Sequence, residues 1–170
     1  MTSMLSRARG RRTRTAAAAG AACLALVALS ACEKPTPMTT ITVGSDSVHS
    51  EASCYNDGKK LGQEDFARCL SEGDGPTESI TVAQGDTLRL GVEPEIAERG
   101  WQVWLEGQQP VAAYSDSTYE TIEAGPLINA VAQTTGEAPE ELRLAIVESG
   151  SATDPEAGSY GVWQYTLNVK

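Results

Sequence analysis

The chain has 170 residues, of which 41% are hydrophobic and 5% aromatic, with 13 basic and 23 acidic side chains. Its length allows one domain of ordinary size once a targeting segment is removed. A formal net charge of −10 argues against a nucleic-acid-binding protein, because phosphate backbones attract basic surfaces.

Residues 1–31 have the composition of a signal peptide. Five arginines and no acidic residue precede a 14-residue apolar stretch, "AAAAGAACLALVAL", at 16–29. This stretch is shorter than the roughly 20 apolar residues that a membrane-spanning helix needs. The pattern is typical of a cleaved leader, so residues 1–31 are excluded from the fold prediction.

The leader ends in "LSAC", residues 29–32, which resembles the lipobox of bacterial lipoproteins. The resemblance implies cleavage before Cys32, a diacylglyceryl thioether on its sulfur, and often acylation of the new amino terminus, as with palmitate. A second acyl chain turns marginal membrane binding into stable anchoring. We therefore expect a lipid-anchored protein on the outer face of the plasma membrane. An ordinary secretory signal cleaved after Ala31 is the alternative.

Removal of the leader makes the chain strongly acidic. Eight basic residues then face 23 acidic ones, a formal net charge of about −15. Such a surface repels nucleic acid and anionic lipid headgroups, so contact with membrane lipid is expected through acylated Cys32. Cationic partners and divalent metals stay open, and so does the alternative that the surplus acid keeps the domain soluble.

Residues 32–40 form the predicted spacer between the anchor and the domain. The stretch "EKPTPMTT" after Cys32 contains two prolines and no apolar periodicity, which is typical of a linker. The domain itself is predicted over 41–170.

The remaining cysteines predict one disulfide. Cys23 lies in the leader and Cys32 is assigned to lipid, which leaves Cys54 and Cys69 in an oxidising compartment. Closing a loop of about 15 residues stabilises a fold by roughly 3 kcal/mol in the chain-entropy model. A redox-active dithiol is the alternative, although the spacing is not C-x-x-C.

Short runs with alternating apolar residues predict β-strands along the domain. They are separated by Gly, Pro, Asn and Asp and lie at 41–43, 79–83, 87–92, 101–105, 118–122, 142–147 and 160–169. This pattern favours an all-β fold, an antiparallel β-sandwich. The phrase "VAQGDTLRLGV…GWQVWLEG" resembles an immunoglobulin-like module, but the short cysteine spacing differs from the inter-sheet disulfide of antibody domains. Short helices are expected at 63–70, 94–98 and 126–133, and a turn at 106–110.

Alternation in the strand at 101–105 separates two tryptophans. Trp101, Val103 and Leu105 share one face, so Trp104 points to the other. Trp104 is therefore a possible interaction surface for a partner. The alternative is that edge loops or bulged strands cover this outer face.

Several phrases together suggest a family. The stretches "CEKPTPMTTITVGSDSVHSEASCYNDGK", "GWQVWLEGQ", "LRLAIVE" and "GVWQYTLNV" resemble an actinobacterial lipoprotein family built on a domain of unknown function. The resemblance implies a lipid anchor and a compact extracytoplasmic domain. That family carries no established activity, so the resemblance transfers no catalytic residue to this chain.

The sequence predicts no catalytic residue, cofactor or metal site. His49 is the only histidine, and on a strand it shares a face with Glu51 but not with Cys54. No nucleophile elbow, P-loop or dinucleotide motif is present. The acidic pairs 95/98 and 140/141 are candidate general acids and bases, although an acidic surface creates such pairs by chance.

The resulting expectation is a non-catalytic interaction module that presents a surface to an unknown protein or envelope component. A cell-envelope enzyme using acidic residues and a small-ligand- or metal-binding lipoprotein are the alternatives.

Overall fold

The computed structural model describes residues 35–71, 77–151 and 158–170. The leader and Cys32 therefore lie outside the described residues. All described residues except Pro35 belong to one compact unit, Thr36–Lys170. Within these ranges, no helix is both long and apolar enough to cross a membrane. The first strand of this unit begins at Thr39, and the domain boundary at residue 41 stays a prediction.

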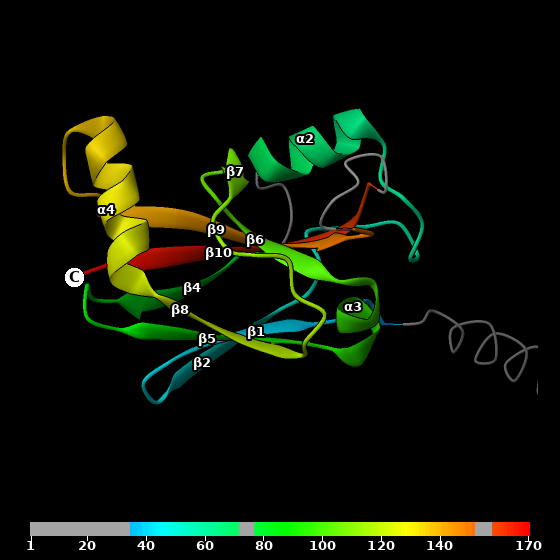
Figure 1. The fold of residues 1–170 in the computed structure, drawn as a ribbon, viewed down its shortest axis with the longest axis horizontal. Helices are drawn as coiled ribbons and strands as arrows, with labels where there is room; N and C mark the ends of the chain where they lie inside the picture. The colour runs from blue at the N-terminus through cyan, green and yellow to red at the C-terminus, as the bar shows by residue number, and fades with distance from the viewer. Residues whose placement is uncertain (1–34, 72–76, 152–157) are drawn as a thin grey trace, which may run out of the picture. The chain divides into compact units, whose positions relative to one another are not determined.

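Two sheets form the body of the domain (Figure 1). The first sheet has the strand order β2-β1-β5-β8, with every neighbouring pair antiparallel. Its strands are β1 (Thr39–Val43), β2 (Asp46–Ser50), β5 (Thr87–Val92) and β8 (Tyr119–Glu123).

The second sheet is built around its longest strand, β10. On one side β10 pairs with β9, and on the other it pairs with β3 and, in parallel, with β4. Beyond β9 the order continues through β6 to β7. The strands are β3 (Cys54–Tyr55), β4 (Thr77–Val82), β6 (Trp101–Leu105), β7 (Gln109–Pro110), β9 (Glu141–Ser149) and β10 (Ser159–Val169).

The main core lies between the two sheets, as the period-2 pattern predicts. Trp101, Trp163 and Tyr165 are the largest fully buried side chains, and Leu88 and Leu90 face them from the first sheet. The prediction of an all-β sandwich is therefore confirmed, with one parallel pair among antiparallel ones. The immunoglobulin-like assignment stays a prediction.

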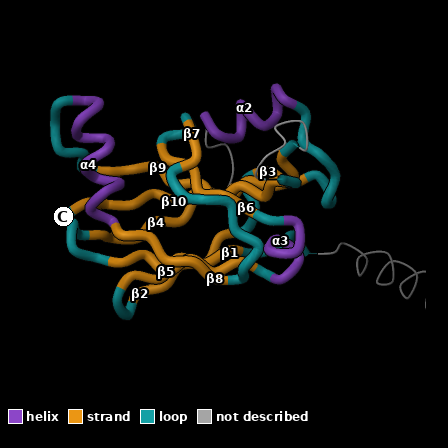
Figure 2. The backbone as a smooth tube through the Cα atoms, in the orientation of Figure 1, coloured by secondary structure: helices purple, strands orange, loops and turns teal. Residues whose placement is uncertain are grey.

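Helices lie at the periphery of the sheets (Figure 2). They are α2 (Gln63–Ser71), α3 (Pro94–Arg99) and α4 (Ala124–Thr135), each slightly longer than the sequence predicted. Leu127 and Ile128 of α4 are buried in the main core, and α4 ends at Gly136, whose positive φ of 83° closes the last turn. Because α3 follows the end of β5 and α4 follows the end of its antiparallel neighbour β8, the two helices lie at opposite ends of the sandwich (Figure 1).

The first residues of the domain are fastened at the α3 end. The indole N–H of Trp163 donates to the carbonyl of Pro37 over 2.8 Å, and Glu93 N–H donates to the carbonyl of Met38 over 3.3 Å. One residue later, the hydroxyls of Thr39 and Tyr165 share a buried hydrogen bond of 2.6 Å. The chain is thus held from Pro37 onward.

Candidate functional site

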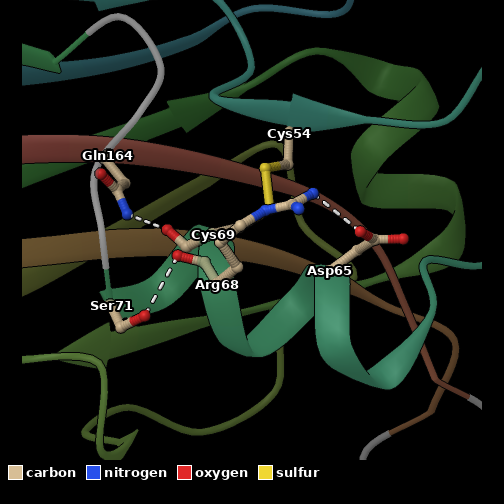
Figure 3. The surroundings of a disulfide bond; sticks show 6 residues. All are labelled: Cys54, Asp65, Arg68, Cys69, Ser71 and Gln164. Atoms are coloured by element: carbon tan, nitrogen blue, oxygen red, sulfur yellow. Dashed lines mark hydrogen bonds and ion pairs between the residues drawn. A yellow bond between two sulfur atoms is a disulfide. The ribbon is translucent and has the colours of Figure 1, made fainter.

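The predicted disulfide is present and ties α2 to the outer face of the second sheet. Cys54 of β3 and Cys69 of α2 are bonded, with their Cα atoms 6.1 Å apart. Close to it, the side-chain amide of Gln164 in β10 donates to the carbonyl of Cys69 (Figure 3). An exposed ion pair between Arg68 and Asp65, 2.7 Å, lies along the helix beside the disulfide.

A second, smaller apolar cluster lies beneath α2. Cys69 and Leu70 of the helix pack with Ala145, Val147 and Val162, which point away from the main core. This explains why β9 is buried on both faces over several consecutive residues. The covalent link to β3 holds the helix over this second cluster.

Trp104 belongs to the same outer face. Its indole meets the ring of Phe66 edge to face, with centroids 5.6 Å apart. The side chain is half-buried, and its Nε1 has no hydrogen-bond partner among the described residues. The alternation that placed Trp104 opposite Trp101 is confirmed, but Phe66 covers part of the indole. A role as an interaction anchor stays a prediction.

The other residues singled out by the sequence are dispersed. His49 is exposed on β2, where its Nδ1 lies 2.8 Å from the hydroxyl of Thr40, and Cys54 is engaged in the disulfide. Glu140 and Glu141 are exposed where the chain enters β9. In the part of the chain that the structure describes, no three His, Cys, Asp or Glu side chains gather as metal ligands would.

A buried carboxylate that sequence reasoning missed lies at the α3 end. Glu148 follows Leu142, Leu144 and Ile146 on the inner face of β9, and it is 0% exposed. Its Oε1 accepts from Nη1 of Arg99, whereas Oε2 has no partner among the described residues. The signal was available, because extending the period-2 pattern of the "LRLAIVES" strand by two residues places an acid on the core face.

Aromatic side chains and backbone fix this ion pair. The guanidinium of Arg99 lies over the ring of Tyr160, 4.3 Å from its centroid, and the hydroxyl of Tyr114 donates to the Arg99 carbonyl over 2.6 Å. Burial raises the pKa of Glu148, and Arg99 opposes the shift while the charge of Glu95 adds to it. Because Glu148 is fully enclosed, its carboxylate holds Arg99 in place and does not face solvent.

Arg99 borders an open hollow at this end of the domain. Glu95 and Glu98 of α3 line it with Arg99, over about 560 Å³. Glu95 also accepts a hydrogen bond of 3.4 Å from the hydroxyl of Tyr55. The predicted acidic pair 95/98 is therefore found together, beside a fixed cation.

A second hollow, of about 250 Å³, lies at the opposite end, between α4 and the β6–β7 turn. Its lining is mostly apolar on the floor and polar at the rim. The lining residues are Leu105, Glu106, Gln108, Val111, Ala130, Val131, Thr134, Thr135 and Arg143.

No family model, curated protein or solved structure matches the chain. The resemblance to an actinobacterial lipoprotein family therefore stays a prediction.

Proposed function

We propose that the protein is a lipid-anchored, extracytoplasmic binding module that presents its sandwich to a protein or another component of the cell envelope. The observation that carries the proposal is the "LSAC" sequence at 29–32, followed within a few residues by a stapled β-domain. The leader supplies the export signal, and acylation of Cys32 supplies the anchor.

Chain length limits how far the domain reaches from such an anchor. The domain holds its own chain from Pro37 onward, five residues after Cys32. An extended chain covers at most about 3.6 Å per residue, so Pro37 lies within about 18 Å of the anchored cysteine. In the proposed arrangement the α3 end is the end nearer the bilayer.

The α4 end is then the end available to a partner. β5 begins at Thr87, which pairs with Glu123 just before α4. It ends at Val92, which pairs with Thr39 at the start of the first strand. Six residues of antiparallel strand extend about 20 Å. The α4 end is offset by about this length from the place where the chain joins the domain.

The enclosed ion pair of Arg99 and Glu148 fits a binding role of the domain better than a catalytic role. A general acid must reach a reacting atom at hydrogen-bond distance, whereas Glu148 is 0% exposed and paired with Arg99. The pair fixes a cation at the surface instead. This arrangement supports a binding role for the domain.

Fractionation of cells that express Cys32→Ser tests the anchor. The wild-type chain should take up a palmitate analogue and sediment with membranes, and the variant should lose both properties. Cys23→Ser, in the leader, is the matched control and should behave like the wild type. Membrane association of an unlabelled Cys32→Ser chain would contradict the lipid anchor.

A further inference from the structure

α4 is an uncharged helix on a strongly acidic domain. None of its twelve residues is charged, and its last turn contains no basic residue. The buried residues, Ala124, Gly125, Leu127 and Ile128, all lie in its first half, whereas Ala130, Gln133, Thr134 and Thr135 are exposed. The second half of the helix therefore offers a neutral surface next to the 250 Å³ hollow.

The hollow has the size and floor of a site for one large apolar side chain. Leu105 is buried, and Val111 and Val131 are half-buried and pack against the main core. Pockets for drug-sized molecules usually enclose about 300–1,000 Å³, so this hollow is smaller than that class. One aromatic side chain from a partner fits such a volume and brings a large apolar area with it.

Charges around the hollow favour a cationic partner. Glu106 lines it, Glu137 and Glu140 are exposed on the connection from α4 to β9, and Glu141 is exposed at the start of β9. The carbonyl end of α4 adds negative potential, which the helix's own last turn does not offset with a cation. A positively charged group at the rim is therefore attracted from two directions.

Arg143 lines the hollow but is already engaged. Its backbone N–H donates to Oε1 of Glu106 over 2.7 Å, and its Nε lies 3.4 Å from Oε2. Its Nη1 donates to the carbonyl of Ser71 over 3.0 Å. The guanidinium thus braces the rim and is balanced by Glu106, while exposed Glu137 and Glu141, each two residues along the chain from a lining residue, supply the surplus negative charge.

We propose that the hollow between α4 and the β6–β7 turn docks a segment of a partner protein in which a large aromatic side chain is flanked by lysine or arginine. The aromatic ring enters the hollow, and the cations meet Glu106 and the carbonyl end of α4. The proposal rests on the proposed function, because it names the partner class of the same binding module. The site is at the end of the sandwich away from Pro37.

A peptide titration tests the docking site. The probe is acetyl-Lys-Trp-Lys-amide carrying 5-fluorotryptophan, observed by fluorine NMR with the full-length chain in non-ionic detergent and with detergent alone as blank. The fluorine line should broaden and shift with protein. Unlabelled Lys-Trp-Lys should displace the probe, whereas Glu-Trp-Glu and Lys-Ala-Lys should compete at least about tenfold more weakly, since each lacks one of the two features.

Variants on α4 locate the binding. Ala130→Trp fills the hollow and Thr134→Lys adds a like charge at its rim, so each should weaken the probe about tenfold or more. Gln133→Trp and Gln133→Lys, exposed on the same turn but outside the lining, are the matched controls and should bind as the wild type. Equal binding by Ala130→Trp and Gln133→Trp, or equal competition by the acidic peptide, would overturn the proposal.

Photo-cross-linking in cells separates this proposal from the proposed function. A photoreactive residue is placed at position 134 or at the exposed position 49 on β2. Cross-links to a partner's aromatic-basic segment from 134 support the docking site. Cross-links from 49 alone overturn the docking site and leave the binding module standing, and no cross-link from either position counts against both.

Discussion

The ion pair at the α3 end gives the sharpest test of how the domain is held together. Arg99→Ala removes the partner of a carboxylate that is 0% exposed and whose second oxygen already has no partner among the described residues. Breaking a buried pair by removing one member costs about 3–5 kcal/mol, because the remaining charge is left uncompensated. Most domains have about 5–15 kcal/mol of unfolding free energy, so this loss is a large fraction of the total.

The unfolding free energy lost in Arg99→Ala should depend on pH, and the burial of Glu148 determines the direction. Burial raises the pKa of Glu148 in the folded chain above its usual 4.5, so its protonated form favours folding. That contribution is complete below about pH 4.5 and is lost as the pH rises through the folded-state pKa. Removing Arg99 raises the pKa further. The loss of unfolding free energy in Arg99→Ala should therefore shrink as the pH is lowered toward about 4.5, where the protonated form of Glu148 needs no cation.

Urea unfolding at a series of pH values is the assay. Glu148→Gln should flatten this part of the pH profile, and adding it to Arg99→Ala should recover most of the lost stability. Glu98→Gln, an exposed carboxylate in the same region, is the control and should leave the profile unchanged. If Arg99→Ala costs less than about 1 kcal/mol at every pH, the reasoning that the enclosed charge needs its partner is refuted.

Three further predictions concern stability. Replacing Cys54 and Cys69 together by serine should lower the unfolding free energy by about 3 kcal/mol in urea titrations; an unchanged midpoint would contradict a structural staple. Gly100→Ala should destabilise the domain by more than Gly44→Ala, because both glycines have positive φ but only the former lies against a tyrosine ring; equal melting temperatures would count against this. Burial raises the pKa of Tyr165 to about 12, so stability should fall above about pH 10, as the unfolded chain ionises first, and Tyr165→Phe should remove that fall.

Much of the fold was predictable because alternating patterns reported which face is buried. Trp101 and Trp104 are three residues apart, and the structure puts the first in the main core and the second on the outer face, as a strand requires. The seven predicted strands all appear. The predicted helix at 126–133 appears within α4, whose buried Leu127 and Ile128 mark the core-facing side.

The missed elements lack the signals that such patterns need. β2 is an edge strand, "DSVHS", exposed along most of its length, so it has no apolar alternation to detect. β3 and β7 are only two residues each and are defined by their neighbours. The parallel pairing of β4 with β10 joins segments more than eighty residues apart, and local patterns do not encode such partners.

The candidate sites were harder to predict than the fold. Glu148 was hidden because an acid at the end of an apolar run normally marks the end of a strand, and its partner Arg99 lies 49 residues away. Phe66 covers part of Trp104 because the disulfide holds α2 over this face of the sheet. The positions of the two cysteines in the sequence do not specify where the helix lies. Convergence of distant side chains is a property of the tertiary structure.

The position of β10 has a consequence for the timing of folding. β10 is synthesised after every other described element, yet it joins β9 to both β3 and β4 and supplies Trp163 and Tyr165 to the core. Until it emerges, β3 and β4 lack their pairing partner in the second sheet, and the core lacks Trp163, Tyr165 and Leu167. A growing chain is therefore kept from closing prematurely, which fits the export that the proposed function requires. Truncations before Ser159 should accumulate as protease-sensitive chains.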